Sequence, residues 1–315
     1  MGDDGVGRTP ALDKTVVGVA VLECLVHHSQ SVSQALGKRH KTTARIAQQL
    51  VMVVHSFLPS IPIKMIGDGA YSVIELGLTC VKECVCLIAP LRLDARLFAP
   101  PPPPKPHQKG RPPVVGKRLP KLSTLLHDPK TAWETLTVTW YGGTERKLEV
   151  TTGTALWYST GTAPLPIRWV LTRDPEGKRE TKAYFSTNQA QSAAEIVADF
   201  VKRWSIEVTF EESRAHLGVE TQRQWSDLAI ERSTPCLFGL YSVVVLLGHA
   251  LHPDGAIPVQ QAAWYPKTQA TFSDVLATVR RHCWGGLTFQ TSPADPDVCL
   301  VSRSDLTRLV QAACY

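Results

Sequence analysis

Residues 61–90 read IPIKMIGDGAYSVIELGLTCVKECVCLIAP, and this stretch decides the fold class. The apolar run at 61–66 predicts a short strand, the periodic segment at 72–80 predicts a helix, and the apolar run at 85–90 predicts a second, buried strand. A strand, a helix and a strand in this order indicate an α/β sheet. Asp68 follows the first strand between two glycines. Because ligands bind at the carboxyl ends of strands in open α/β sheets, Asp68 is a candidate site residue.

The segments on either side of this unit differ in kind. Upstream, Thr42–Leu58 shows the apolar periodicity of a helix that Pro59 ends, while Val16–Val26 is an apolar run that fits either a buried strand or a helix. Downstream, residues 100–121 combine prolines with lysines and arginines, which predicts an extended basic connector. A solvated linker and a strap that lies along phosphates fit this connector equally well, so both interpretations stay open.

Thr131–Thr187 is rich in threonine, valine, tryptophan and tyrosine, and it carries turn signals such as Gly142-Gly143 and Asp174-Pro175-Glu176-Gly177. This pattern predicts a β-sheet segment made mostly of hairpins. The expected strands are Thr135–Trp140, Lys147–Thr152, Thr154–Ser159, Ile167–Thr172 and Thr181–Ser186.

Helical periodicity resumes after this segment. Ser192 and Glu195 form a capping-box signature, and the helix that they begin is expected to run to Leu217, with Gly218 as its C-cap. Two further helices are expected, at 228–251 and 304–313.

The chain has 315 residues, 43% of them hydrophobic, and a formal net charge of +6. This length allows one large domain with an insertion or two domains, and the mild basic excess fits a polyanion partner without requiring one. No stretch reaches the roughly 18 uncharged apolar residues of a spanning helix, so Cys236–Leu251 is interpreted as a buried core helix and no membrane association is expected.

The sequence shows no secretory signal, which predicts a cytoplasmic protein with reduced thiols. Among the eight cysteines, Cys80, Cys84 and Cys86 lack the second pair that a zinc site needs. They are therefore interpreted as core thiols in an apolar run.

Four residues of the helix expected after Ser192 lie at spacings of three, four and seven, namely Phe200, Arg203, Glu207 and Arg214. In an uninterrupted helix these positions share one face. For an arbitrary helix, an ion pair on a solvated face would explain them. Here Trp204 and its apolar neighbours predict that an adjacent face is buried, so the charged face is expected to line a site.

The segment Arg203-Trp204-Ser205-Ile206-Glu207 resembles a signature of bacterial insertion-sequence transposases with DDE chemistry. That family pattern is Tyr-x2-Arg-x3-Glu-x6-Lys, and this chain has Phe200 for the Tyr and Arg214 for the Lys. The stretch Gly67-Asp68-Gly69-Ala70-Tyr71 resembles the second acidic motif of the same family. The resemblance covers about residues 36–315.

The resemblance implies an α/β fold with an RNase H-like mixed-sheet core that is incomplete at its N-terminus. A mainly antiparallel β insertion domain interrupts this core, and helices follow it. The expected parts are a partial core at 1–95, a basic linker and β-rich insertion at 96–187, helices that carry the catalytic Glu and complete the core at 188–250, and a C-terminal helical region at 251–315.

The resemblance also assigns roles to side chains. It implies that Asp68 and Glu207 are catalytic residues that bind Mg²⁺ or Mn²⁺, which favour oxygen ligands. It implies double-stranded DNA with transposon terminal repeats as the partner, bound by a possible homodimer. The expected DNA-binding residues are Arg203, Arg214, Trp204, Arg223 and Trp225, although core packing is the preferred interpretation of Trp204.

Such enzymes use three carboxylates, and the first is expected on a strand well before Asp68. Asp3, Asp4 and Asp13 are the acids available there, and none follows a β-type apolar run. The sequence therefore predicts a truncated and catalytically impaired transposase with an exposed sheet edge. A non-catalytic DNA-binding remnant or regulator, another RNase H-like nuclease and a translated pseudogene are the alternatives.

Overall fold

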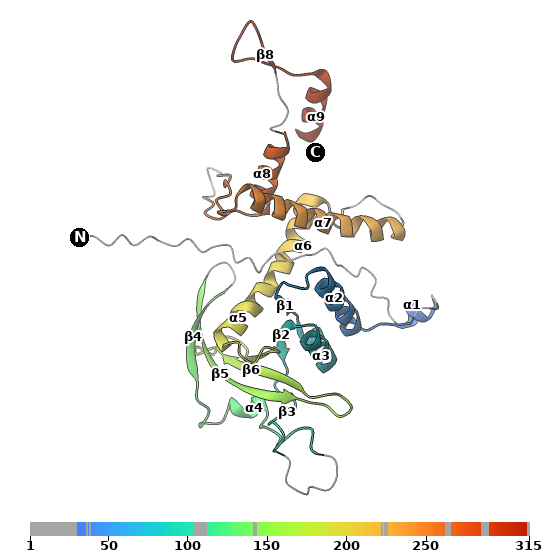
Figure 1. Cartoon of the computed structure of the whole chain (residues 1–315). Coiled ribbons are helices and arrows are strands. Elements are labelled where there is room, and N and C mark those ends of the chain that lie inside the picture. Colours follow the sequence, from blue (N-terminus) through green and yellow to red (C-terminus); the bar gives the residue numbers. More distant parts are fainter. Residues whose placement is uncertain are drawn as a thin grey trace, which may run out of the picture. The chain divides into compact units, whose positions relative to one another are not determined.

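The structure is a computed structural model of the chain and describes residues 30–35, 37, 39–103, 112–140, 144–221, 223, 226–261, 266–284 and 290–313 (Figure 1). The chain divides into two compact units, one within Leu22–Thr209 and the other containing Phe210–Tyr315.

The first unit holds the sheet and the helices that cover it. Its helices are α1 (Gln30–Ala35), α2 (Thr43–Phe57), the 3-10 helix η1 (Gly69–Tyr71), α3 (Ile74–Lys82), α4 (Leu122–Leu125), α5 (Ala193–Val201), the 3-10 helix η3 (Lys202–Trp204) and the start of α6 (Ser205–Leu217). Its strands are β1 (Ile63–Ile66), β2 (Val85–Leu91), β3 (Leu97–Phe98), β4 (Glu134–Thr139), β5 (Glu145–Trp157), β6 (Leu165–Arg173) and β7 (Lys182–Ser186).

The predicted strand-helix-strand unit is confirmed. β1 and β2 pair in parallel, with Ile63 opposite Val85 and Ile66 opposite Ile88, and α3 connects them. The helix predicted upstream is α2, and the Thr42 hydroxyl caps it by accepting a hydrogen bond from the backbone N–H of Arg45.

The sheet is mixed, as predicted, and its strand order is β1-β2-β7-β6-β5-β3, with β4 paired to β5. All pairs other than β1–β2 are antiparallel. β7 pairs directly with β2, so the β-rich segment extends the same sheet rather than building a second one. β1 lies at one end of this order and pairs with β2 alone among the described strands.

One prediction within the β-rich segment was wrong. Two strands were expected on either side of Gly153, but β5 runs through it as one strand of 13 residues. Gly153 faces Trp169 across the β5–β6 pair, and a Cβ at this position would lie 2.9 Å from the Trp169 ring. The glycine therefore makes room for an indole ring and does not mark a turn.

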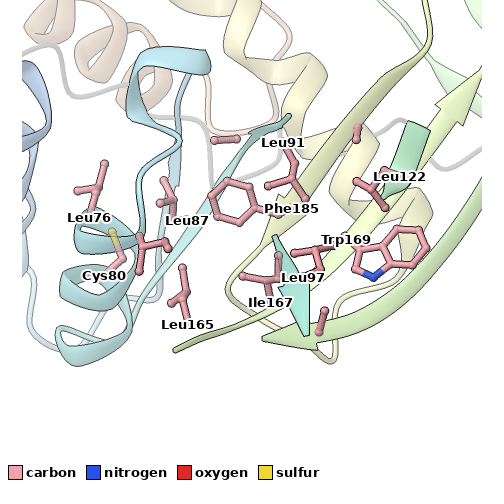
Figure 2. Close-up of a cluster of buried hydrophobic side chains, with 14 of the residues drawn as sticks. Leu76, Cys80, Leu87, Leu91, Leu97, Leu122, Leu165, Ile167, Trp169 and Phe185 are labelled. Atoms are coloured by element: carbon pink, nitrogen blue, oxygen red, sulfur yellow. The ribbon is translucent and has the colours of Figure 1, made fainter. Parts of the chain in front are cut away.

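The two faces of the sheet carry separate apolar clusters. On one face, Leu76 and Cys80 of α3 point towards the strands and meet Leu87 and Leu165, with Phe185 beside them (Figure 2). On the other face, α5 contributes its buried residues to a cluster with β2, β5, β6 and β7. This second cluster consists of Ile88, Val138, Leu148, Val150, Val170, Tyr184, Ala193, Ile196 and Val197.

The second unit is mostly helical. It contains the remainder of α6, α7 (Asp227–Leu251), α8 (Phe272–Trp284), the short strands β8 (Gln290–Thr291) and β9 (Cys299–Leu300), and α9 (Arg303–Ala313). α7 and α8 pack through Val244, Phe272, Leu276 and Val279.

The interpretation of Cys236–Leu251 as a buried core helix was wrong. Several large apolar side chains of α7 are exposed, among them Leu240, Val243 and Leu247. Over its most apolar window α7 has a mean hydropathy of 1.7 with 22% of residues buried, so by length and composition it meets the criterion for a membrane span. A single helix that meets it is weak evidence, because core helices also pass.

The cysteine interpretation holds for only part of the run. Cys80 is fully buried, and burial raises the pKa of its thiol to about 12. Cys84 is exposed and lies in the turn after α3 with a positive φ of 53°.

Candidate functional site

Asp68 lies directly after β1, where the sequence places it. Its side chain caps η1, since its Oδ1 accepts a hydrogen bond from the backbone N–H of Ala70 at 2.8 Å. The side chain is exposed, so it is free to meet a ligand from solvent. Burial and the negative charge of Asp68 together raise the pKa of Tyr71.

The helix after Ser192 begins as predicted but does not run unbroken. Ser192 and Glu195 form the capping box, and α5 then gives way to η3 before α6 begins. Phe200 packs on Tyr184 with ring centroids 4.5 Å apart, so it belongs to the sheet cluster and not to the charged face. The prediction of one shared face was wrong here, because the 3-10 turn changes the angular step between residues.

Arg203 and Glu207 form an ion pair one helical turn apart. The Nη2 atom of Arg203 donates to Oε1 of Glu207 at 2.9 Å, and the Glu207 side chain is 42% exposed. A guanidinium carries five N–H donors, so this pair leaves Arg203 able to bind a phosphate oxygen as well.

α5 runs in the same sense as β2, as two contacts along their length show. Near its start, the Cys86 thiol donates to Oε1 of Gln191 at 3.8 Å. Near its end, Phe200 meets Tyr184, whose strand partner is Pro90. The two contacts occur in the same order along β2 and α5, so the two elements are parallel.

This shared direction relates the two candidate acids. β1 is parallel to β2, so β1 and α5 both point to the same edge of the sheet. Asp68 follows β1 at that edge, and Glu207 lies on α6, which follows α5 after the 3-10 helix η3. The chain thus leaves both β1 and α5 towards the edge formed by the carboxyl ends of the parallel strands, where Asp68 lies.

A buried carboxylate that the sequence did not reveal ties this helix to the strand before Asp68. Asp199 of α5 is 5% exposed, and its Oδ2 accepts from Lys64 of β1 at 2.7 Å and from the amide of Gln191 at 2.6 Å. Lys202 lies 3.3 Å from the other oxygen. Breaking a buried ion pair of this kind leaves an uncompensated charge, so the network fixes α5 on β1.

The remaining predicted DNA-binding residues are placed differently. Arg214 belongs to the second unit, where its Nη1 lies 3.3 Å from Oε1 of Glu220, and Arg223 is exposed. Trp225 lies outside the described residues. Trp204 is 43% exposed, so the prediction that it packs in the core was wrong, and its ring is accessible to a partner.

The comparison with known families adds an independent observation. Residues 28–164 match the family model described as DDE superfamily endonuclease. This match supports a DDE-type, transposase-like nuclease, and the mixed α/β sheet is compatible with the RNase H-like fold of such proteins. The matched span is less than half of the chain; it includes Asp68 and ends before the helix of Glu207. No curated protein matches the chain.

Nucleases of the DDE superfamily generally use divalent metal ions, which bind best to oxygen ligands. Within the described part of the chain, no three His, Cys, Asp or Glu side chains group closely enough to hold a metal ion. Asp68 caps a helical turn and Glu207 pairs with an arginine. Two carboxylates fall short of the oxygen ligands that Mg²⁺ requires, so these residues alone do not fit the metal centre and no catalytic step follows from them.

Proposed function

We propose that this protein is a DDE-type transposase-like protein that binds double-stranded DNA and is catalytically impaired. Its binding surface would be the sheet edge beyond β1 and α5. The observation that carries this proposal is the family match over residues 28–164 together with the placement of Asp68 at the end of β1. The transposase signature around Arg203 and Glu207 supports it, because α5 points to the same edge.

The proposed roles follow from charge and exposure. Arg203 would contact backbone phosphates, and the exposed ring of Trp204 would stack on or beside a base. In the second unit, Arg214 and Arg223 would add phosphate contacts. Trp225 would add a further aromatic contact. Transposon terminal repeats are the proposed DNA target and a homodimer the proposed assembly, in the cytoplasm.

The proposed impairment rests on the acids. Asp68 and Glu207 would supply two of the three carboxylates that the chemistry requires, and no three His, Cys, Asp or Glu side chains of the described residues group closely enough to hold a metal ion. Mg²⁺ or Mn²⁺ would therefore bind weakly at this edge. DNA binding does not need this metal, because it depends on neutralising phosphates.

DNA binding can be measured by fluorescence anisotropy with a labelled duplex of 30 base pairs between about 50 and 200 mM salt. We expect the logarithm of the binding constant to fall linearly with the logarithm of salt concentration, without added metal. Arg203→Gln should weaken binding and lower the salt slope by about one. The matched control is Lys82→Gln, because this exposed lysine ends α3 at the opposite edge of the sheet. Absence of duplex binding by the wild-type protein would refute the proposal.

A regulator that occupies transposon ends without cutting them is the second candidate function. The arginine of the proposed binding surface and the incomplete acid set favour it equally. It differs from an impaired enzyme only in chemistry, so residual metal-dependent cleavage of terminal-repeat DNA by the wild-type protein would identify an impaired enzyme, and binding without cleavage would identify a regulator.

A further inference from the structure

A cavity of about 300 Å³ lies on the face of the sheet that α5 covers. Its apolar wall comes from Trp140, Leu148 and Tyr184, which also belong to the cluster on that face. The rest of its lining is dominated by charged side chains from β5, β6, β7 and the turn between β6 and β7. These are Arg146, Arg173, Asp174, Arg179, Glu180 and Lys182.

The charges of this lining favour an anion. Arg173 is compensated by Glu149, its cross-strand partner, at 2.6 Å. Arg146, Arg179 and Lys182 remain, and none of the three forms an ion pair within the described part of the chain. Asp174 lines the same cavity, but its Oδ1 already accepts a turn hydrogen bond from the N–H of Glu176. Glu180 is the second carboxylate of the lining. The cavity therefore has three available cations against two carboxylates.

Arg146 supplies the decisive observation. Its guanidinium lies over the Trp140 ring, 4.6 Å from the centroid, and this contact holds it at the cavity wall. Its Nη1 is buried and has no hydrogen-bond partner among the residues that the structure describes. A buried, charged donor without an acceptor is costly in a native fold, so an acceptor from outside the chain is expected at this position.

The cavity also lies at the sheet edge that carries Asp68. β7 runs antiparallel to β2, so Lys182 at its start is at the edge where β2 ends. Tyr184 joins the cavity to Phe200 near the end of α5. β1 and β5, the strand that carries Arg146, are four strand spacings apart in the sheet order, about 19 Å, which corresponds to roughly six base pairs along a duplex.

We infer that this cavity binds a phosphate group through Arg146, with Arg179 and Lys182 beside it. If the proposed function holds, this phosphate is a backbone phosphodiester of the DNA that crosses the edge. Only this identification of the phosphate, and not the phosphate site itself, rests on the proposed function. A free phosphate would satisfy the same donors. The site would read no base sequence, because its charged donors meet only phosphate oxygens.

Two variants test the inference, Arg146→Gln and Lys182→Gln. Glutamine keeps much of the stacking length at position 146 while removing the charge, and Lys182 is exposed, so its substitution leaves the fold intact. The matched control is Lys147→Gln, which removes a charge from the neighbouring residue of β5 that faces the other side of the sheet. Circular dichroism and thermal unfolding show whether each variant folds. If Arg146→Gln does not fold, Lys182→Gln alone tests the inference.

We expect each cavity variant to weaken duplex binding about tenfold and to lower the salt slope by about one, while Lys147→Gln changes affinity by less than about twofold. If the wild-type protein binds the duplex and both variants behave like Lys147→Gln, the cavity holds only water and the inference is wrong, while the proposed function stands.

A second arm separates the sources of phosphate. Thermal unfolding is compared in inorganic phosphate and in chloride at equal ionic strength. If the wild-type protein binds no duplex but phosphate raises its Tm, and Arg146→Gln removes that rise, the phosphate site is supported and the proposed function fails. If neither DNA nor phosphate acts on the wild-type protein, both are overturned.

Discussion

Asp274 is a buried carboxylate of α8 held by several donors. Burial alone would raise its pKa, but the backbone N–H groups of Gln260 and Thr271 and the ammonium of Lys267 outweigh it and lower the pKa to about 2. A pKa below the ordinary value means that the charged carboxylate stabilises the fold above about pH 4. This stabilisation is lost as the pH falls towards 2.

Asp274→Asn should therefore lower the free energy of unfolding of the second unit by about 2 kcal/mol at pH 7. The difference from wild type should shrink between about pH 4 and pH 2, because the wild-type carboxylate becomes protonated there. Urea unfolding followed by tryptophan fluorescence at several pH values measures it. Asp297→Asn, at an exposed position of the same unit, is the control. A difference that stays constant with pH would contradict the assigned charge state.

The sequence predicts the roles of some site residues but not of others. Asp68 and Glu207 could be found, because a strand end and a family signature mark them locally. Asp199 and Arg146 carry no such mark. Asp199 meets Lys64 from 135 positions away, and the buried Nη1 of Arg146 depends on neighbouring strands that assemble only in the folded sheet. Their roles come from tertiary contacts that a local pattern does not contain.

At the scale of elements, the fit of α3 against β6 depends on a single glycine. A Cβ at Gly77 would collide with the side chain of Leu165, which is fully buried and has little room to move. Gly77→Ala should gain about 1 kcal/mol of helix propensity but lose about 1–3 kcal/mol to overpacking. We expect net destabilisation of about 1 kcal/mol.

Gly239→Ala provides the matched comparison within α7. Apart from the adjoining backbone of α7, no heavy atom of the described residues lies within 4 Å of a Cβ at this position, so the helix propensity acts alone and should raise the free energy of unfolding by up to about 1 kcal/mol. Urea titrations of both variants measure the two changes. Equal effects of the two substitutions would show that α3 does not pack on β6 as described.

The elements themselves were largely predictable, and the exceptions have physical causes. Periodicity and capping located α2, β1, α3, β2 and α5, because each carries its own pattern of burial. The pattern failed at Gly153, where a glycine accommodates a ring, and in η3, where a 3-10 turn changes the helical step. It located α7 correctly but not its burial, because an apolar composition does not specify what covers a helix.

At the scale of the whole molecule, one sheet joins segments that the sequence separates. β7 follows β2 by about ninety residues and still pairs with it, so the β-rich segment and the strand-helix-strand unit form one body. A hairpin pattern predicts which strands pair with their neighbours, but not that the last of them returns to β2. This pairing brings the α5 helix, the cavity and Asp68 to one edge.

The central claim is that this edge binds DNA but lacks the acids to cut it. The most direct test is nicking of supercoiled plasmid DNA in Mg²⁺ and in Mn²⁺ by the wild-type protein and by Asp68→Ala, at concentrations that saturate the DNA. We expect no nicking by the wild-type protein above the level of Asp68→Ala. Metal-dependent nicking that Asp68→Ala abolishes would contradict it, and would show that Asp68 belongs to a complete catalytic centre.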